Sequence, residues 1–149
     1  MPNRQTDSNF RFTFGKHERL CSRAAIGKLV REGKSLNHYP FRLLYLEVAA
    51  SSEALLSPVQ LAIAVPKRSF KRAVKRNLLK RRIREAYRTN KHLFYQRVQA
   101  KNISVNLLLV YVSAEILSYS EIEQKLVALL QRLSKRLEEG AGISIDTAG

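Results

Sequence analysis

The sequence contains few of the residues on which most protein active sites depend. It has one cysteine, Cys21, in 149 residues, so it can form neither an internal disulfide nor a zinc site with a second nearby cysteine. No apolar run approaches the roughly 18 to 20 residues of a membrane span, and the start MPNRQTDSNF lacks the apolar segment of a signal peptide. We therefore expect a cytoplasmic protein in which Cys21 is a small, partly buried residue.

The shortage of acidic residues argues against a protein nuclease. A metal-dependent nuclease holds Mg²⁺ with clustered carboxylates. The two aspartates, Asp7 and Asp146, lie near the chain ends, and the glutamates are not spaced to share a metal. His17, His38 and His92 lie in three separate segments, without the paired acid and base that a metal-free ribonuclease needs. We expect no catalytic residue and no metal site in the protein itself.

Positive charge is the abundant feature of this sequence. It has 27 basic and 12 acidic residues, a formal net charge of +15 and a pI of about 10.5, which favours a polyanionic partner. The residues from 66 to 92 contain a single acid, Glu85. The basic residues of this stretch are Lys67, Arg68, Lys71, Arg72, Lys75, Arg76, Lys80, Arg81, Arg82, Arg84, Arg88 and Lys91.

Helical geometry sorts this basic stretch into two faces. The segment from Phe70 to Arg88 has no glycine or proline and is predicted to be a helix. At 100° per residue, one sector collects Asn77, Lys80, Arg81, Arg84 and Arg88, and Leu79, Ile83 and Ala86 lie opposite. An ordinary solvated face would mix charges of both signs, so a face that binds nucleic acid is the favoured interpretation.

The rest of the chain predicts further helices and strands. Ser22 is placed to cap a helix with Ile26, Leu29 and Val30 on one side, and Gly33 is expected to end it. Strands are predicted at residues 41–48, 59–65 and 103–112, with the second buried on both faces. Residues 49–57 are expected to form a loose hairpin loop, and residues 90–100 the fraying end of the basic helix and a loop.

The final helix is predicted from a long apolar stripe. Either Ser118 or Ser120 could form a capping box with the glutamate three residues later, and Gly140 is expected to stop the helix. The stripe consists of Ile122, Leu126, Leu129, Leu130, Leu133 and Leu137. The element order is α-β-β-α-β-α, which predicts a single-domain α/β sandwich in which helices cover a sheet.

The ends of the chain are expected to be disordered. Residues 1–9 and 140–149 are small or polar, which leaves residues 10–139 as the folded domain. Phe10, Phe12 and Phe14 alternate with polar residues at its start. At least two of these rings are expected to pack on the core, and stacking on an RNA base remains an alternative for one.

The basic stretch resembles the signature of the bacterial ribonuclease P protein subunit. The matching residues are Val65-Pro66-Lys67-Arg68 and the run from Ala73 to Glu85, AVKRNLLKRRIRE. The resemblance extends from about residue 10 to 138, including Phe14, Arg19-Leu20 and Arg31-Glu32-Gly33. The family pattern has Arg-Asn-Arg where this chain has Arg76-Asn77-Leu78, which puts one RNA contact in doubt.

The resemblance implies a fold and separate roles for the protein and an RNA. It implies a left-handed β-α-β crossover containing the basic helix, and a catalytic RNA that removes the 5′ leader of precursor tRNA with Mg²⁺ bound mainly by RNA. The protein, expected to be a monomer by itself, would bind that RNA and the leader. The RNA-binding residues would be Lys67, Arg68, Arg76, Asn77, Lys80, Arg81, Arg84 and Arg88.

The resemblance also implies a leader-binding cleft. Ile26 and Val30 stand where relatives commonly have phenylalanine, and Phe41 and Tyr45 are further candidates on the first strand. A structural RNA-binding protein, such as a ribosomal protein, is the alternative function. A DNA-binding protein with the basic helix in a major groove is a third hypothesis.

Overall fold

The computed structural model describes residues 14–48 and 57–142, with side chains through residue 139. Of the segments predicted to be disordered, 1–9 and 140–149, residues 1–9 and 143–149 lie outside the described residues, as do Phe10, Phe12 and most of the 49–57 loop. Residues 140–142 belong to the last helix, so the prediction of disorder is wrong for them. The elements are the 3₁₀ turn η1 (Lys16–Glu18), α2 (Arg23–Glu32), β1 (Lys34–His38), β2 (Phe41–Val48), β3 (Val59–Ala64), α3 (Ala73–Asn90), α4 (His92–Ala100), β4 (Ser104–Tyr111) and α5 (Tyr119–Gly142).

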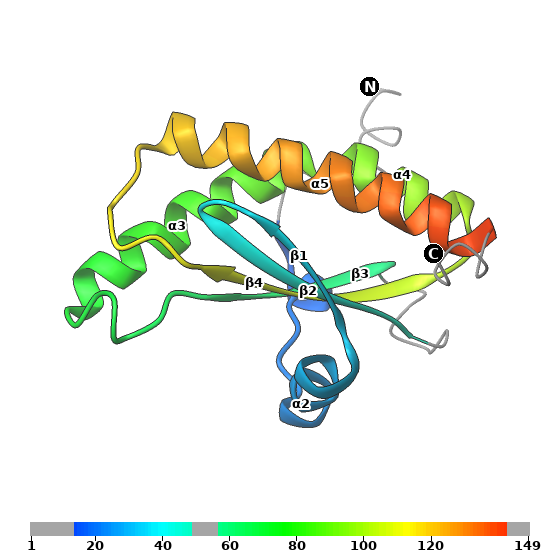
Figure 1. The fold of residues 1–149 in the computed structure, drawn as a ribbon, viewed down its shortest axis with the longest axis horizontal. Helices are drawn as coiled ribbons and strands as arrows, with labels where there is room; N and C mark the ends of the chain where they lie inside the picture. Colours follow the sequence, from blue (N-terminus) through cyan, green and yellow to red (C-terminus); the bar gives the residue numbers. More distant parts are fainter. Residues whose placement is uncertain (1–13, 49–56, 143–149) are drawn as a thin grey trace, which may run out of the picture.

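A four-stranded sheet in the order β1-β2-β4-β3 forms the middle of the molecule. β2 is antiparallel to both β1 and β4, and β3 is parallel to β4. Figure 1 shows α3, α4 and α5 on one side of the sheet and α2 on the other. The mixed α/β fold is confirmed, and the parallel crossover from β3 to β4 contains the basic helix, α3.

Strand order corrects one prediction. β2 and β3 do not form a hairpin, because β4 lies between them and pairs with both. β3 is consequently at an edge of the sheet, and only Val59 and Leu61 of its residues are buried, so it is not buried on both faces as predicted. A hairpin between consecutive strands is the commonest local arrangement, but here the long-range pairing of β4 prevails.

Besides the short η1 turn, one strand and one helix were not predicted from the sequence. β1 has only one buried residue, Leu36, and is a strand because it pairs along its length with β2. Residues 92–100 form α4 instead of a loop, with Phe94 and Val98 buried one turn apart. α3 and α4 meet at Lys91, whose φ of −80° and ψ of −20° are nearly helical.

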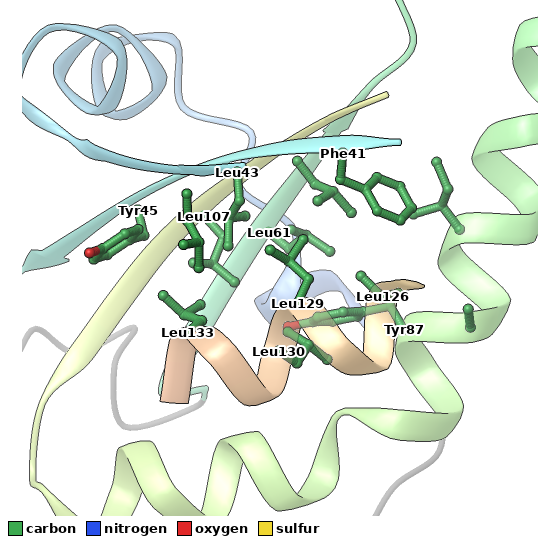
Figure 2. Close-up of a cluster of buried hydrophobic side chains, with 14 of the residues drawn as sticks. Phe41, Leu43, Tyr45, Leu61, Tyr87, Leu107, Leu126, Leu129, Leu130 and Leu133 are labelled. Atoms are coloured by element: carbon green, nitrogen blue, oxygen red, sulfur yellow. The ribbon is translucent and has the colours of Figure 1, made fainter. Parts of the chain in front are cut away.

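The main core lies between the sheet and the α3–α5 layer. Every residue of the predicted apolar stripe on α5 is at most 5% exposed, which confirms that prediction. In Figure 2 Leu43, Leu61 and Leu107 of the sheet point toward Leu129 and Leu133 of α5. Burying these side chains stabilises the domain by about 1.5 to 3 kcal/mol each.

The start of α2 agrees with the prediction from the sequence, and its end differs slightly. Ser22 Oγ accepts the Ala25 N–H at 3.2 Å, as predicted for the start of α2. α2 ends before Gly33, whose φ of −71° is not left-handed. A Cβ on Gly33 would lie 2.4 Å from the Leu29 carbonyl oxygen, so close packing requires glycine there.

Ser118 forms the capping box of the last helix. Its Oγ accepts the Glu121 N–H at 3.2 Å, and the Glu121 carboxylate accepts the Ser118 N–H at 3.2 Å. α5 extends two residues past Gly140, to Gly142. Cys21 is exposed, so its predicted role as a partly buried residue is wrong.

Candidate RNA interface

α3 is amphipathic in the sense that the sequence predicted. Its buried residues are Leu79, Ile83, Ala86 and Tyr87, each at most 1% exposed. On the other side Asn77, Arg81 and Arg84 are exposed and Lys80 is half-buried. These four side chains therefore share one face of a helix that is held rigidly by the core behind it. We call them the α3 basic face.

Several basic residues of this segment act within the fold. Arg76 donates from Nη1 to the carbonyls of Phe70 at 2.7 Å and Lys71 at 2.9 Å, which stabilises the turn leading into α3. Arg82 donates to the Leu117 carbonyl at 2.6 Å and so holds the loop before α5. The proposed RNA contact of Arg76 is thus shared with a structural role.

Arg88, Lys67 and Arg68 complete the predicted RNA-binding set. Arg88 forms a two-point ion pair with Glu85, with Nη2–Oε2 at 2.6 Å and Nε–Oε1 at 3.0 Å. The hydrogen bond from Arg88 lowers the pKa of Glu85, so the pair stays charged. Lys67 and Arg68 are exposed in the turn between β3 and α3 and extend the positive surface.

A groove of about 270 Å³ runs beside the α3 basic face. We call it the β3 groove. Lys80 and Arg84 supply one wall, β3 the floor, and the segment before α2 the other wall. Its lining residues are Phe14, Arg19, Leu20, Leu61, Ala62, Ile63, Lys80 and Arg84. An apolar floor between cationic walls suits a single nucleic-acid strand, whose bases are apolar and whose phosphates are anionic.

The opposite wall of the β3 groove is anchored to the edge strand. The Leu20 N–H donates to the Leu61 carbonyl at 3.0 Å, and Gln60 Nε2 donates to the His17 carbonyl at 3.2 Å. The Arg19 guanidinium lies 5.6 Å from the centre of the Phe14 ring. The sequence analysis did not select Arg19 as a site residue, because a single arginine outside the basic run carries no local signal.

The four leader-cleft candidates separate into two groups. Ile26 is half-buried and Val30 is 58% exposed on α2. Phe41 and Tyr45 are 1% and 4% exposed and lie in the core, on the side of the sheet covered by α5. The prediction for Phe41 and Tyr45 is therefore wrong, because both side chains lie in the core on the face of the sheet opposite α2.

Strand alternation identifies the residues that were missed. Side chains of successive strand residues point to opposite faces, so Arg42, Leu44 and Leu46 face the α2 side, where they are exposed or half-buried. In the paired register Leu108 of β4 lies beside Leu44, and Ala62 of β3 lies beside Leu108 on its other side. The alternation was visible in the sequence, but only the pairing shows which set faces α2.

The described residues hold no group of three metal-ligating side chains. His38 is half-buried, and burial together with the charges of Arg132 and Lys125 lowers its pKa. Arg132 Nη1 lies 3.2 Å from His38 Nδ1 and donates to the Asn37 carbonyl at 2.8 Å, so His38 belongs to the contact between β1 and α5.

Comparison with known proteins identifies the family to which the chain belongs. The family model for ribonuclease P matches residues 14–134, which include α3 and the whole β3 groove. The chain belongs to the ribonuclease P protein family.

Relatives support the assignment over nearly their full length. The ribonuclease P protein component of Porphyromonas gingivalis is 36% identical over 131 residues, which cover 87% of this chain and 93% of the relative. The component from Petrotoga mobilis is 30% identical over 126 residues, which cover 81% and 95%. The ribonuclease P protein of Thermotoga maritima superposes with a TM-score of 0.61 at 26% identity, covering 77% of this chain and 96% of that structure.

Family membership decides among the functions considered from the sequence. The chain is the RNA-binding subunit of ribonuclease P, which acts in maturation of the tRNA 5′ end, and its partner is the ribonuclease P RNA. The alternative of a structural RNA-binding protein such as a ribosomal protein is not favoured. Within residues 14–48 and 57–142, no helix is both long and apolar enough to cross a membrane.

Proposed function

We propose that this ribonuclease P protein has no active site of its own and acts by binding two RNAs. The α3 basic face binds the ribonuclease P RNA, and the β3 groove with the α2 side of the sheet binds the 5′ leader of precursor tRNA. The observation that carries the proposal is the groove itself, which places an apolar floor next to Lys80 and Arg84.

The α3 basic face suits a folded RNA. Arg81 and Arg84 are exposed arginines, whose planar guanidinium groups can donate two parallel hydrogen bonds to a phosphate. Asn77 adds an amide that can donate or accept. Because the helix is packed on the core through Leu79 and Ile83, its backbone is already in place and only the side chains lose freedom on binding.

The leader is a single strand, and the groove offers both kinds of contact that a single strand uses. Lys80, Arg84 and Arg19 can neutralise phosphates, while Ala62 and Ile63 give the bases an apolar surface. Ile26 and Val30 belong to α2, which lies over the other side of the sheet, and would give the leader further apolar surface there. Because both α2 residues are aliphatic, contact there is by van der Waals packing.

The bond-breaking chemistry belongs to the RNA in this proposal. Hydrolysis of a phosphodiester at neutral pH needs a bound metal or paired acid and base groups, and His17, His38 and His92 lie in separate elements. Mg²⁺ is bound mainly by the RNA subunit and the substrate. We propose that the free protein is a monomer and that the complex acts in the cytoplasm.

Leader-dependent cleavage tests this proposal. We expect the purified protein, added to ribonuclease P RNA at low Mg²⁺, to accelerate cleavage of a precursor tRNA with a leader of several nucleotides. The acceleration should be much smaller for a precursor with a one-nucleotide leader, because little of that leader reaches the groove. Gel analysis of the released leader measures both rates.

Two results would contradict the proposal. Equal acceleration of the two substrates would exclude leader binding as the source of the effect. No acceleration of either substrate, with RNA that is active at high Mg²⁺, would show that the protein does not assist this reaction.

A further inference from the structure

A polar cluster that is largely buried ties the segment before α2 to the junction of α3 and α4. Glu18 Oε1 accepts hydrogen bonds from Lys91 Nζ and from the Tyr95 hydroxyl, the latter at 2.8 Å. Glu18 Oε2 accepts the Gly15 N–H at 2.9 Å. The Tyr95 hydroxyl also lies 2.9 Å from the Tyr87 hydroxyl. One carboxylate therefore connects the η1 turn, α3 and α4.

The cluster is placed where an ion pair is sensitive to loss of one partner. Lys91 is 3% exposed and the Glu18 side chain is 14% exposed. Burial lowers the pKa of Lys91, and the hydrogen bond and charge of Glu18 oppose that shift. Removing one partner of such a pair costs more than the intact pair contributes to net stability, because the other charge is left buried and unpaired.

The segment held by Glu18 carries one wall of the β3 groove. Phe14, Arg19 and Leu20 lie within four residues of Glu18 and face Lys80 and Arg84 across the groove. The Phe14 ring packs edge-on against Tyr87, with ring centres 5.6 Å apart. The Arg19 Nη2 donates to the Phe14 carbonyl at 3.4 Å. A shift at Glu18 would thereby reach Arg19, the arginine that the described part of this wall contributes.

We propose that Glu18 is a positioning residue for leader binding. Its contacts with Lys91 and Tyr95 keep Arg19 and Phe14 opposite the α3 basic face, so that the groove has cations on both walls. This inference rests on the proposed function of the groove. Glu18 does not itself line the groove, so its effect on the leader is indirect.

Leader-dependent kinetics of the assembled ribonucleoprotein test the role of Glu18. In Glu18→Gln we expect KM for a precursor with a long leader to rise about threefold to tenfold, because the wall loses its anchor. The kcat for the long-leader precursor should not change. The KM for a precursor with a one-nucleotide leader should not change either. Glu139→Gln removes the same charge from an exposed position on α5 and should change none of these values.

A spectroscopic readout separates positioning from folding. Cys21 is the only cysteine of the chain and is exposed next to the anchored segment, so it accepts a nitroxide label without further substitution. We expect the label to become more mobile in Glu18→Gln and to stay as in the wild type in Glu139→Gln. All measurements are made below the lowest melting temperature of the set.

A double variant tests whether stability alone explains the effect. Glu18→Gln with Lys91→Met removes both charges of the buried pair and should regain thermal stability, while KM for the long leader stays raised. If Glu18→Gln alone does not fold, Tyr95→Phe, which loses one hydrogen bond to Glu18, should shift KM in the same direction by less.

Three results decide the question. Recovery of both stability and KM in the double variant would reduce Glu18 to a stabilising residue and overturn the inference. Normal leader discrimination in a folded Glu18→Gln, or in Tyr95→Phe where that variant is needed, would overturn it as well. Failure of the wild-type protein to distinguish long from short leaders would instead refute the proposed function.

Discussion

At the residue scale, the basic side chains of the 66–92 stretch have two different roles, contacts within the fold and contacts with RNA. Arg76 and Arg82 donate to backbone carbonyls, and Arg88 and Lys91 pair with glutamates. Arg81 and Arg84 are exposed, so their guanidinium groups can bind phosphate. A charge in the sequence is therefore not equivalent to a charge available to RNA.

Arg81→Ala tests whether an exposed arginine of α3 contributes to RNA binding without contributing to the stability of the fold. We expect affinity for the ribonuclease P RNA to fall by about 1 to 2 kcal/mol and the salt slope of binding to shrink by about 1, because one phosphate contact is lost. The melting temperature of the free protein should not change. Filter binding at several salt concentrations gives both quantities.

Lys135→Ala on α5 is the matched control, since Lys135 is equally exposed and lies on a different helix. It should leave affinity and slope close to wild type. An unchanged slope in Arg81→Ala would show that RNA does not contact this part of α3.

At the element scale, a helix in this fold depends on its ends as well as on its apolar face. α5 starts with a reciprocal pair of hydrogen bonds between Ser118 and Glu121. Lys91 lies where α3 and α4 meet, and its buried ion pair with Glu18 is at this junction. Contacts at the ends of these helices therefore help to position the helices relative to the rest of the fold.

Ser118→Ala tests the capping box. We expect it to lower the free energy of unfolding by about 0.5 to 2 kcal/mol, because the Glu121 N–H loses its acceptor. Ser120→Ala, inside the first turn and exposed, should change stability by less than about 0.5 kcal/mol. Urea denaturation measures both, and equal losses in the two variants would place the cap elsewhere.

At the scale of the whole molecule, the positive net charge lowers the stability of the free protein and strengthens its binding to RNA. A formal charge of +15 repels itself within the folded domain, and RNA relieves that repulsion. Salt screens charges of either sign. The free protein and its complex should therefore respond to salt in opposite directions.

Raising KCl from about 0.05 to about 0.3 M should increase the melting temperature of the free protein. The same change should weaken assembly with the RNA subunit steeply, with a logarithmic slope of about −4 to −7 for five to eight phosphate contacts. Calorimetry and equilibrium binding measure the two effects. A melting temperature that falls with salt would mean that attraction between charges outweighs their repulsion in the fold.

Periodic patterns were predicted well because they depend on local geometry. The phase of α3 placed Leu79 and Ile83 inside and Arg81 and Arg84 outside, and the stripe of α5 was buried as expected. β1 and α4 were missed, because their residues carry weak local signals and are fixed by pairing with β2 and packing against the core.

The sequence by itself determined the positive charge, its position on one helical face and the apolar stripe that packs beneath the sheet. These follow from composition and from the fixed angle between successive residues of a helix. Only the tertiary structure decided the strand order, the burial of Phe41 and Tyr45, and the link from Glu18 to Lys91, 73 positions apart. Such contacts depend on which distant segments pair, and no local pattern specifies that choice.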